Sequence, residues 1–133
     1  MDYGTLASLL LAVVFGGVVG FEREKIHKPA GLRTHMLVCL GSCLYTIIST
    51  NFSIAPAQIA AGIVAGIGFI GAGTIWAEKD KVQGVTTAAS LWATAAVGLT
   101  VGIGDYALAA VTTLLVFIIL ISRKLFIKLG IEH

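Results

Sequence analysis

Charged side chains gather where the first long apolar stretch of the sequence gives way to the second. Glu22, Arg23 and Glu24 close the first stretch, and Arg33 and His35 open the next. Carboxylates at a membrane boundary are costly unless they are paired, so we expect an ion pair between Glu22 and Arg33 or between Arg23 and Glu24. Two interpretations stay open: a gate, proton relay or docking surface, or charges that only anchor helix ends and set the topology.

A second group of residues with metal-binding chemistry lies along the stretch that follows. His35, Cys39 and Cys43 are spaced four apart, and imidazole and thiolate are ligands that suit Zn or Cu. Residues four apart on a rigid helix rise about 6 Å per step, so at most two neighbours could grip one ion. We therefore expect Cys39 and Cys43 to be small buried packing residues, and we predict neither a metal site nor a disulfide between them.

The segment GIGFIGAG, residues 66–73, has the glycine spacing of a dinucleotide-binding fingerprint at Gly66, Gly68 and Gly71. That fingerprint needs a strand before it, a helix after it and an acidic residue about 20 positions further on. The preceding AQIAAGIVA is typical of a helix, and no carboxylate stands near residue 91. We therefore set the dinucleotide interpretation aside.

Small residues four positions apart favour helix packing instead, because they let membrane helices approach closely. Gly62 and Gly66 form one such pair, and Gly73 lies two turns beyond Gly66 on a similar face. The same spacing recurs at Gly68 and Ala72, at Gly16 and Gly20, and at Ser90, Thr94, Gly98 and Gly102. Four glycines within eight residues also weaken a helix, so a broken or re-entrant element that aims backbone groups at a solute stays open. The candidate residues for either role are Gly62, Gly66, Gly68, Gly71 and Gly73.

The composition identifies the elements that must position these residues. Hydrophobic residues make up 57% of the 133-residue chain, charged residues make up 12%, and the mean hydropathy is +0.96, which leaves too little polar surface for a soluble domain. Five apolar blocks approach the roughly 20 helical residues that cross a bilayer. We predict a single all-α domain, residues 1–133, of five transmembrane helices at about 4–21, 35–52, 56–77, 87–103 and 106–122.

The basic residues predict the orientation of these spans. All nine follow the first, third or fifth span, and five spans place those three segments on one face. The positive-inside rule then puts the N-terminus outside and the C-terminus in the cytoplasm. Asp105 is an acid on the outer face, where we expect a tight turn beside Gly104 rather than a pore mouth. The basic residues are Arg23, Lys25, Lys28, Arg33, Lys79, Lys81, Arg123, Lys124 and Lys128.

The remaining polar residues point away from catalysis. Thr86 or Thr87 is expected to cap the fourth span, and the basic C-terminal end suits anionic lipid headgroups. Aromatic residues are not interleaved with basic ones as nucleic-acid binding would require. No hydrolase triad is evident, and no predicted span interior holds an Asp or Glu for a magnesium cage. We predict no enzyme activity, no cofactor and no nucleic-acid partner.

Four ordered motifs resemble the MgtC/SapB family of bacterial inner-membrane proteins over roughly residues 4–120. They are GFERE (20–24), GLRTHMLVCLGS (31–42), GIGFIGAGTI (66–75) and VQGVTTAASLWATAAVGLTVGIGDY (82–106). The resemblance implies a multi-pass plasma-membrane protein linked to magnesium homeostasis and virulence. It also implies action on other membrane machinery, including inhibition of the F-type ATP synthase.

The sequence departs from the pattern of that family in two places. Many members carry a cytoplasmic ACT-like domain after the last span, whereas this chain ends at His133, so we expect a short member or a shortened piece. Members often have an Asp-Pro-x-Arg stretch followed by a Gln, where this chain has Ala55, Pro56, Gln58 and Gly62. A charge-pair mechanism at the outer end of the third span is therefore not carried over.

Two functional hypotheses follow. The first is a regulator that binds a membrane protein complex through cytoplasmic residues and associates with itself in the bilayer, most simply as a dimer. The second is a small channel or transporter for a cation, such as magnesium or a proton, or for another small solute. The cytoplasmic cluster under both is Glu22, Arg23, Glu24, Arg33, His35, Thr86 and Thr87.

Overall fold

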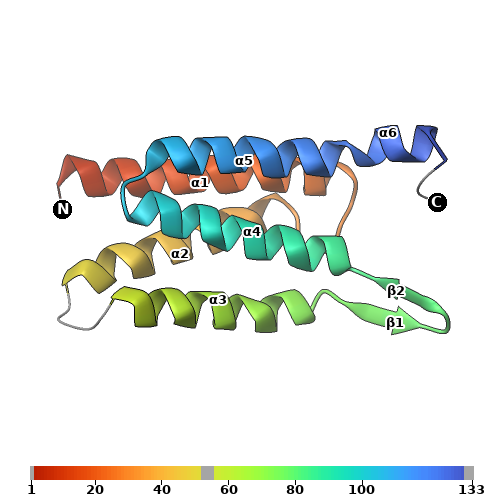
Figure 1. Ribbon diagram of the computed structural model, residues 1–133, viewed down its shortest axis with the longest axis horizontal. Helices are drawn as coiled ribbons and strands as arrows, with labels where there is room; N and C mark the ends of the chain where they lie inside the picture. The colour runs from red at the N-terminus through yellow and green to blue at the C-terminus, as the bar shows by residue number, and fades with distance from the viewer. Residues whose placement is uncertain (1, 52–55, 131–133) are drawn as a thin grey trace.

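The computed structural model describes residues 2–51 and 56–130, which form an up-and-down bundle of helices (Figure 1). Each long helix runs antiparallel to the one before it. The short connections between these helices leave consecutive helices side by side. The elements are α1 (Tyr3–Lys25), α2 (Leu32–Asn51), α3 (Pro56–Ala72), β1 (Trp76–Glu78), β2 (Lys81–Gln83), α4 (Val85–Gly102), α5 (Tyr106–Ile121) and α6 (Arg123–Lys128).

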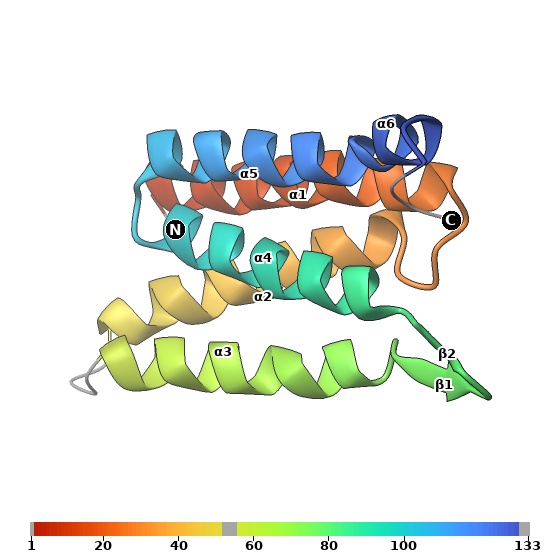
Figure 2. The ribbon, with the colours of Figure 1, turned by 45° about the vertical axis from the view of Figure 1, so that its right-hand side comes forward.

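The bundle has the dimensions of a membrane domain, as predicted. Four helical segments of the described chain are long and apolar enough to cross a bilayer: Tyr3–Lys25, Leu32–Thr50, Val85–Gly102 and Tyr106–Lys128. The fifth long helix, α3, has 17 residues and so rises about 25 Å, at the lower limit for a span. It lies alongside the others in both ribbon views (Figures 1 and 2).

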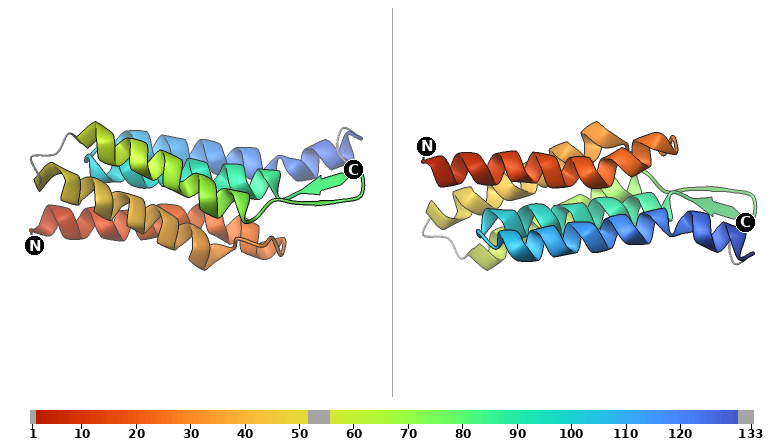
Figure 3. Two further views of the ribbon diagram at one scale, coloured as in Figure 1. Left: turned by 90° about the horizontal axis from the view of Figure 1, so that it is seen from below. Right: turned by 90° about the horizontal axis from the view of Figure 1, so that it is seen from above.

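One boundary prediction was wrong. The third span was expected to reach residue 77, but α3 ends at Ala72 and the chain then forms an antiparallel hairpin in which Trp76 pairs with Gln83. The apolar residues Ile75, Trp76 and Ala77 lengthened the predicted block, although Trp76 and Ala77 belong to strand β1 and Ile75 to the turn before it. The hairpin projects past the ends of α3 and α4 (Figure 3).

The structure gathers the basic segments at one end of the bundle. The α1–α2 connection, the hairpin and α6 lie together there, and the N-terminus lies at the opposite end (Figures 1 and 3). This arrangement agrees with the charge distribution along the sequence. We call this the basic end. Its assignment to the cytoplasm stays a prediction from the positive-inside rule.

The core depends on glycines where α2 crosses α1 and α4. A Cβ at Gly16 would lie 2.6 Å from the carbonyl oxygen of His35, and a Cβ at Gly98 would overlap the carbonyl oxygen of Cys39. Both glycines therefore set how closely the helices approach. The side chains of Cys39 and Cys43 are fully buried at these crossings, in the packing role expected for them.

Hydroxyl groups tie the same helices together within the apolar core. The Ser42 hydroxyl of α2 donates to the carbonyl of Ala95 in α4 at 2.6 Å, and Ser8 of α1 bonds the hydroxyl of Tyr106 in α5 at 2.7 Å. Such bonds stabilise helix pairs in lipid, where burying apolar surface gives no net drive to associate. α4 contacts each of the other four long helices and forms the centre of the bundle.

Candidate functional site at the basic end

Glu22 and Arg23 form a buried ion pair at the end of α1. The Nε of Arg23 donates to Oε2 of Glu22 at 2.6 Å, and the two residues are 1% and 8% exposed. Neither predicted pairing is found in the described chain: Arg33 is exposed and forms no ion pair, and Glu24 bonds elsewhere. Arg23 satisfies the buried Glu22 from the adjacent position, so the pair needs no partner from another helix.

Glu24 stabilises the start of α2 instead. Its Oε2 accepts a hydrogen bond from the backbone amide of Leu32 at 2.9 Å, one of the amides that a helix start leaves without an internal acceptor. A Cβ at Gly31 would overlap this carboxylate, so a larger residue there would displace the Glu24 side chain from the amide. The carboxylate therefore links the end of α1 to the start of α2.

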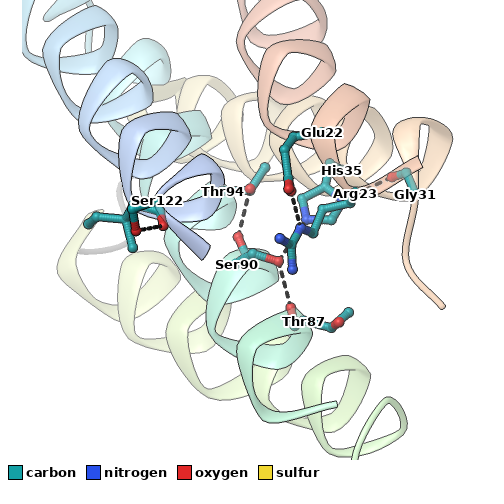
Figure 4. Close-up of polar contacts among 9 residues, drawn as sticks. Glu22, Arg23, Gly31, His35, Thr87, Ser90, Thr94 and Ser122 are labelled. Atoms are coloured by element: carbon teal, nitrogen blue, oxygen red, sulfur yellow. Dashed lines mark hydrogen bonds and ion pairs between the residues drawn. The ribbon is translucent and has the colours of Figure 1, made fainter. Parts of the chain in front are cut away.

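His35 joins α2 to α4 through a chain of hydrogen bonds (Figure 4). Its Nδ1 donates to the carbonyl of Gly31 at 2.9 Å, and its Nε2 lies 3.0 Å from the Oγ of Ser90. The Ser90 hydroxyl also lies 2.8 Å from the carbonyl of Thr87. The Ser90 hydroxyl can donate one hydrogen bond. It donates to Nε2 when the imidazole is neutral, and to the Thr87 carbonyl when Nε2 is protonated. A change of protonation at Nε2 of His35 would therefore redirect the hydroxyl hydrogen of Ser90.

The start of α4 is capped by a glycine rather than by a threonine. Gly84 is the N-cap residue, with φ of 88°, and no side chain bonds the amides of the first turn. Thr86 and Thr87, the predicted caps, lie inside the helix, where Thr86 is exposed and Thr87 is buried. A Cβ at Gly84 would overlap the carbonyl of Thr74 at the end of the α3 turn, which is why a capping side chain has no room.

A cavity of about 970 Å³ opens beside these residues. We call it the basic-end cavity. Its walls come from the end of α1, the α1–α2 connection, the hairpin, the start of α4 and the α5–α6 junction, segments widely separated in the sequence. Arg23 points from α1 toward the first turns of α4 at this place (Figure 4). The basic and imidazole side chains in the wall are Arg23, His27, Lys28, Lys81 and Arg123.

Two glycines of α3, Gly62 and Gly66, face a second hollow, which we call the α2–α3 groove. It measures about 640 Å³, and Gly41, Gly62 and Gly66 are among its lining residues. A Cβ added at any of these three would meet nothing within 4 Å, so within one copy of the chain they make no close helix contact. Helix α3 is continuous through Gly62 and Gly66. The broken-helix interpretation therefore finds no support in the described residues.

The other glycine candidates and Asp105 have separate surroundings. Gly68 faces open space outside the groove, and a Cβ added at Gly71 would lie 3.4 Å from the Cβ of Ala88 in α4. Gly73 follows α3 in the turn toward the hairpin. Asp105 stands at the opposite end of the bundle, where its carboxylate accepts from the amide of Leu108 at 3.0 Å and caps α5 in a turn, as the turn prediction proposed.

The comparison with protein families covers most of the bundle. The model of the MgtC family matches residues 9–128. The chain belongs to the MgtC family. All four motifs that carry the resemblance reach the basic end: GFERE closes α1, GLRTHM opens α2, GIGFIGAGTI leads from α3 to the hairpin, and GVTTAAS opens α4.

Individual members of the MgtC family are similar along most of the chain. Protein MgtC of Brucella abortus (strain 2308) is 46% identical over 123 residues, which cover 91% of this chain and 51% of that protein. "Putative magnesium transporter YhiD" of Escherichia coli (strain K12) is 43% identical over 121 residues, covering 81% and 56%. Protein MgtC of Salmonella typhimurium (strain 14028s / SGSC 2262) is 40% identical over 112 residues, covering 84% and 48%. The chain spans about half the length of these relatives, and no solved structure matches it.

Sequence analysis of this MgtC-family chain missed several residues at the site. Ser90 was noted only as a small residue in a stripe, and neither Lys81 nor Arg123 was connected with Arg23. For Ser90 a signal existed, because a histidine inside an apolar helix needs polar partners. For the two basic residues the sequence held no signal, because their meeting depends on the hairpin and on the bend between α5 and α6.

Proposed function

We propose that this chain is a regulator in the bacterial inner membrane that acts by binding other membrane proteins, without catalysis or conduction of its own. The F-type ATP synthase is the target that the family resemblance implies. The proposal rests on one observation: among the described residues, the inside of the bundle is packed and its buried charges are one neutralised ion pair at one end, whereas a long apolar groove on its outside is open.

The closed interior argues against a path for ions through one copy of the chain. Among the described residues, the buried charged side chains are Glu22 and Arg23, and they neutralise each other at one end. The core between α1, α2, α4 and α5 is packed with small apolar residues and with serines and threonines whose hydroxyls donate to backbone carbonyls. The apolar residues are Ala12, Cys39, Cys43, Val97, Val101 and Ala109, and the hydroxyl residues include Ser42, Thr46, Thr94 and Thr113. A cation crossing this region would meet no carboxylate to replace its hydration shell.

The α2–α3 groove supplies a binding surface of the right kind. It runs along both helices from Thr34 to Tyr45 and from Gln58 to Ile70, about 18 Å at the rise of a helix. Gly62 and Gly66 lower one wall, so that the backbone of another helix can approach closely. We therefore assign the groove to a transmembrane helix of the regulated protein.

Co-reconstitution with a bacterial F-type ATP synthase in liposomes tests this function. The chain should lower ATP-driven proton pumping, and Gly66→Leu, which fills the groove, should relieve that inhibition. Gly68→Leu is the matched control: it makes the same change two residues away, in open space outside the groove. Equal effects of the two variants would contradict the groove as the binding surface.

Two other results would count against the proposal. If cross-linking shows that the purified chain alone forms dimers that Gly66→Leu abolishes, the groove holds a second copy instead of a target. The predicted homodimer would then lie at this surface.

The Escherichia coli relative named as a putative magnesium transporter motivates the other control, in which liposomes holding only the chain are assayed for magnesium and proton flux. Flux without a partner would favour the channel or transporter.

A further inference from the structure

The basic-end cavity has the charge of an anion site. Five of its lining side chains are basic or imidazole (Arg23, His27, Lys28, Lys81 and Arg123), and no Asp or Glu is found among the described residues that line it. Glu22 neutralises Arg23 in part, but its carboxylate bonds the Nε on the α1 side. The cavity therefore concentrates positive charge from four separate segments of the chain.

Arg23 places unused donors in this cavity. Its side chain is 2% exposed, and its hydrogen bond to Glu22 uses Nε alone. The two Nη groups have no hydrogen-bond partner among the described residues, although Arg23 forms part of the cavity wall. No buried side-chain nitrogen or oxygen of the described residues lacks a hydrogen-bond partner, so these Nη groups are open to the cavity rather than sealed in the core. A guanidinium fork is shaped to hold two oxygens of one phosphate.

The first turn of α4 adds backbone donors to the same wall. Residues 84–87 all line the cavity, and the first helical hydrogen bond of α4 runs from the amide of Ala88 to the carbonyl of Gly84. The amides of residues 85–87 precede it and have no side-chain cap. Such a helix start attracts anions through its free amides and the helix dipole. It faces the cavity that Arg23 also lines.

We propose that the basic-end cavity binds a phosphate group held between the Nη atoms of Arg23 and the first turn of α4, with Lys81 and Arg123 at its entrance. The phosphate belongs to an anionic phospholipid headgroup or is free inorganic phosphate. The wall continues onto Ile119 and Phe126, which are 66% and 39% exposed on the outside of the bundle. That apolar continuation suits the acyl chain of a lipid.

The test compares two pairs of exposed basic residues with the same total charge. Lys81→Gln with Arg123→Gln removes two cations from the cavity wall, whereas Lys79→Gln with Lys128→Gln removes two from the same end that do not line it. Binding is measured by titrating detergent-solubilised protein with inorganic phosphate. Retention of phosphatidylglycerol against phosphatidylcholine is measured by native mass spectrometry.

The cavity pair should weaken binding about 25-fold, since each cation near an anionic surface contributes roughly a fivefold step. The control pair should leave binding within about twofold. Arg23→Lys keeps a charge beside Glu22 but removes the fork, and it should weaken binding as well. Should that variant fail to fold, the two glutamine pairs still decide the question.

The two binding measurements identify the source of the phosphate. Retention of phosphatidylglycerol without binding of inorganic phosphate assigns the site to a headgroup, and saturable binding of inorganic phosphate assigns it to the free ion. If both pairs of substitutions weaken binding equally, the effect comes from surface charge alone, and the proposed site is wrong. Binding of neither probe would overturn it too.

Discussion

The Nε2 atom of His35 lies 3.0 Å from the Oγ of Ser90, and this contact joins α2 to α4 at the basic end. His35 is fully buried and Ser90 nearly so. The imidazole is held at its other nitrogen by the carbonyl of Gly31, so its orientation is defined by two helices and their connection.

Ser90→Ala should destabilise the protein by about 1–3 kcal/mol, because it leaves the buried Nε2 of His35 without a partner. Chemical unfolding of the detergent-solubilised protein measures the change. Ser49→Ala is the control: Ser49 is also buried, but its hydroxyl donates within α2 to the carbonyl of Thr46. If Ser49→Ala lowers the free energy of unfolding as much as Ser90→Ala does, the hydrogen bond between the two helices contributes no more than one within a helix.

Gly98→Ala should destabilise the bundle by about 1–3 kcal/mol or more, because the new methyl group would overlap the carbonyl of Cys39 and force α2 and α4 apart. Gly41→Ala, on the open side of α2, meets nothing within 4 Å and should be neutral or stabilising. The thermal unfolding midpoints of the two variants make the comparison. A neutral Gly98→Ala would contradict the close approach of the two helices.

Hydropathy and charge were sufficient to predict the bundle, because long apolar helices and a one-sided distribution of lysine and arginine have few other solutions. Small residues at Gly16 and Gly98 also marked helix crossings that the structure contains. These signals are periodic and local, so they can be read from the sequence without knowing which helices are neighbours.

The details of the basic end escaped prediction for a physical reason. Whether Glu24 meets Arg23 or the amide of Leu32 depends on how α1 turns into α2, and a helix start offers a free amide that a list of charges does not contain. Gly84 capped α4 because the carbonyl of Thr74 left no space for a side chain. Contacts of this kind depend on tertiary structure and cannot be predicted from composition.

Single cysteines should label from opposite sides of the membrane if the bundle has the predicted orientation. Ile103→Cys, at the end opposite the basic segments, should react with a membrane-impermeant maleimide in intact cells, and Asp80→Cys, in the hairpin turn, only after lysis. Both positions are exposed. The native Cys39 and Cys43 are fully buried and should give little background. Labelling of both variants in intact cells would contradict the topology.

Glu22→Gln should destabilise the protein by roughly 3–5 kcal/mol, because it leaves the buried Arg23 without its counter-charge. Removing both charges in Glu22→Gln with Arg23→Gln should cost less than the two single changes added together, since no isolated charge then remains in the bundle. The coupling energy from the four unfolding curves measures the pair. Glu24→Gln provides the control, because Glu24 is exposed and its carboxylate bonds only the amide of Leu32, a bond that the glutamine oxygen can keep. Additive single changes at Glu22 and Arg23 would mean that the 2.6 Å contact contributes no coupling, and that solvent or a bound anion compensates each charge separately.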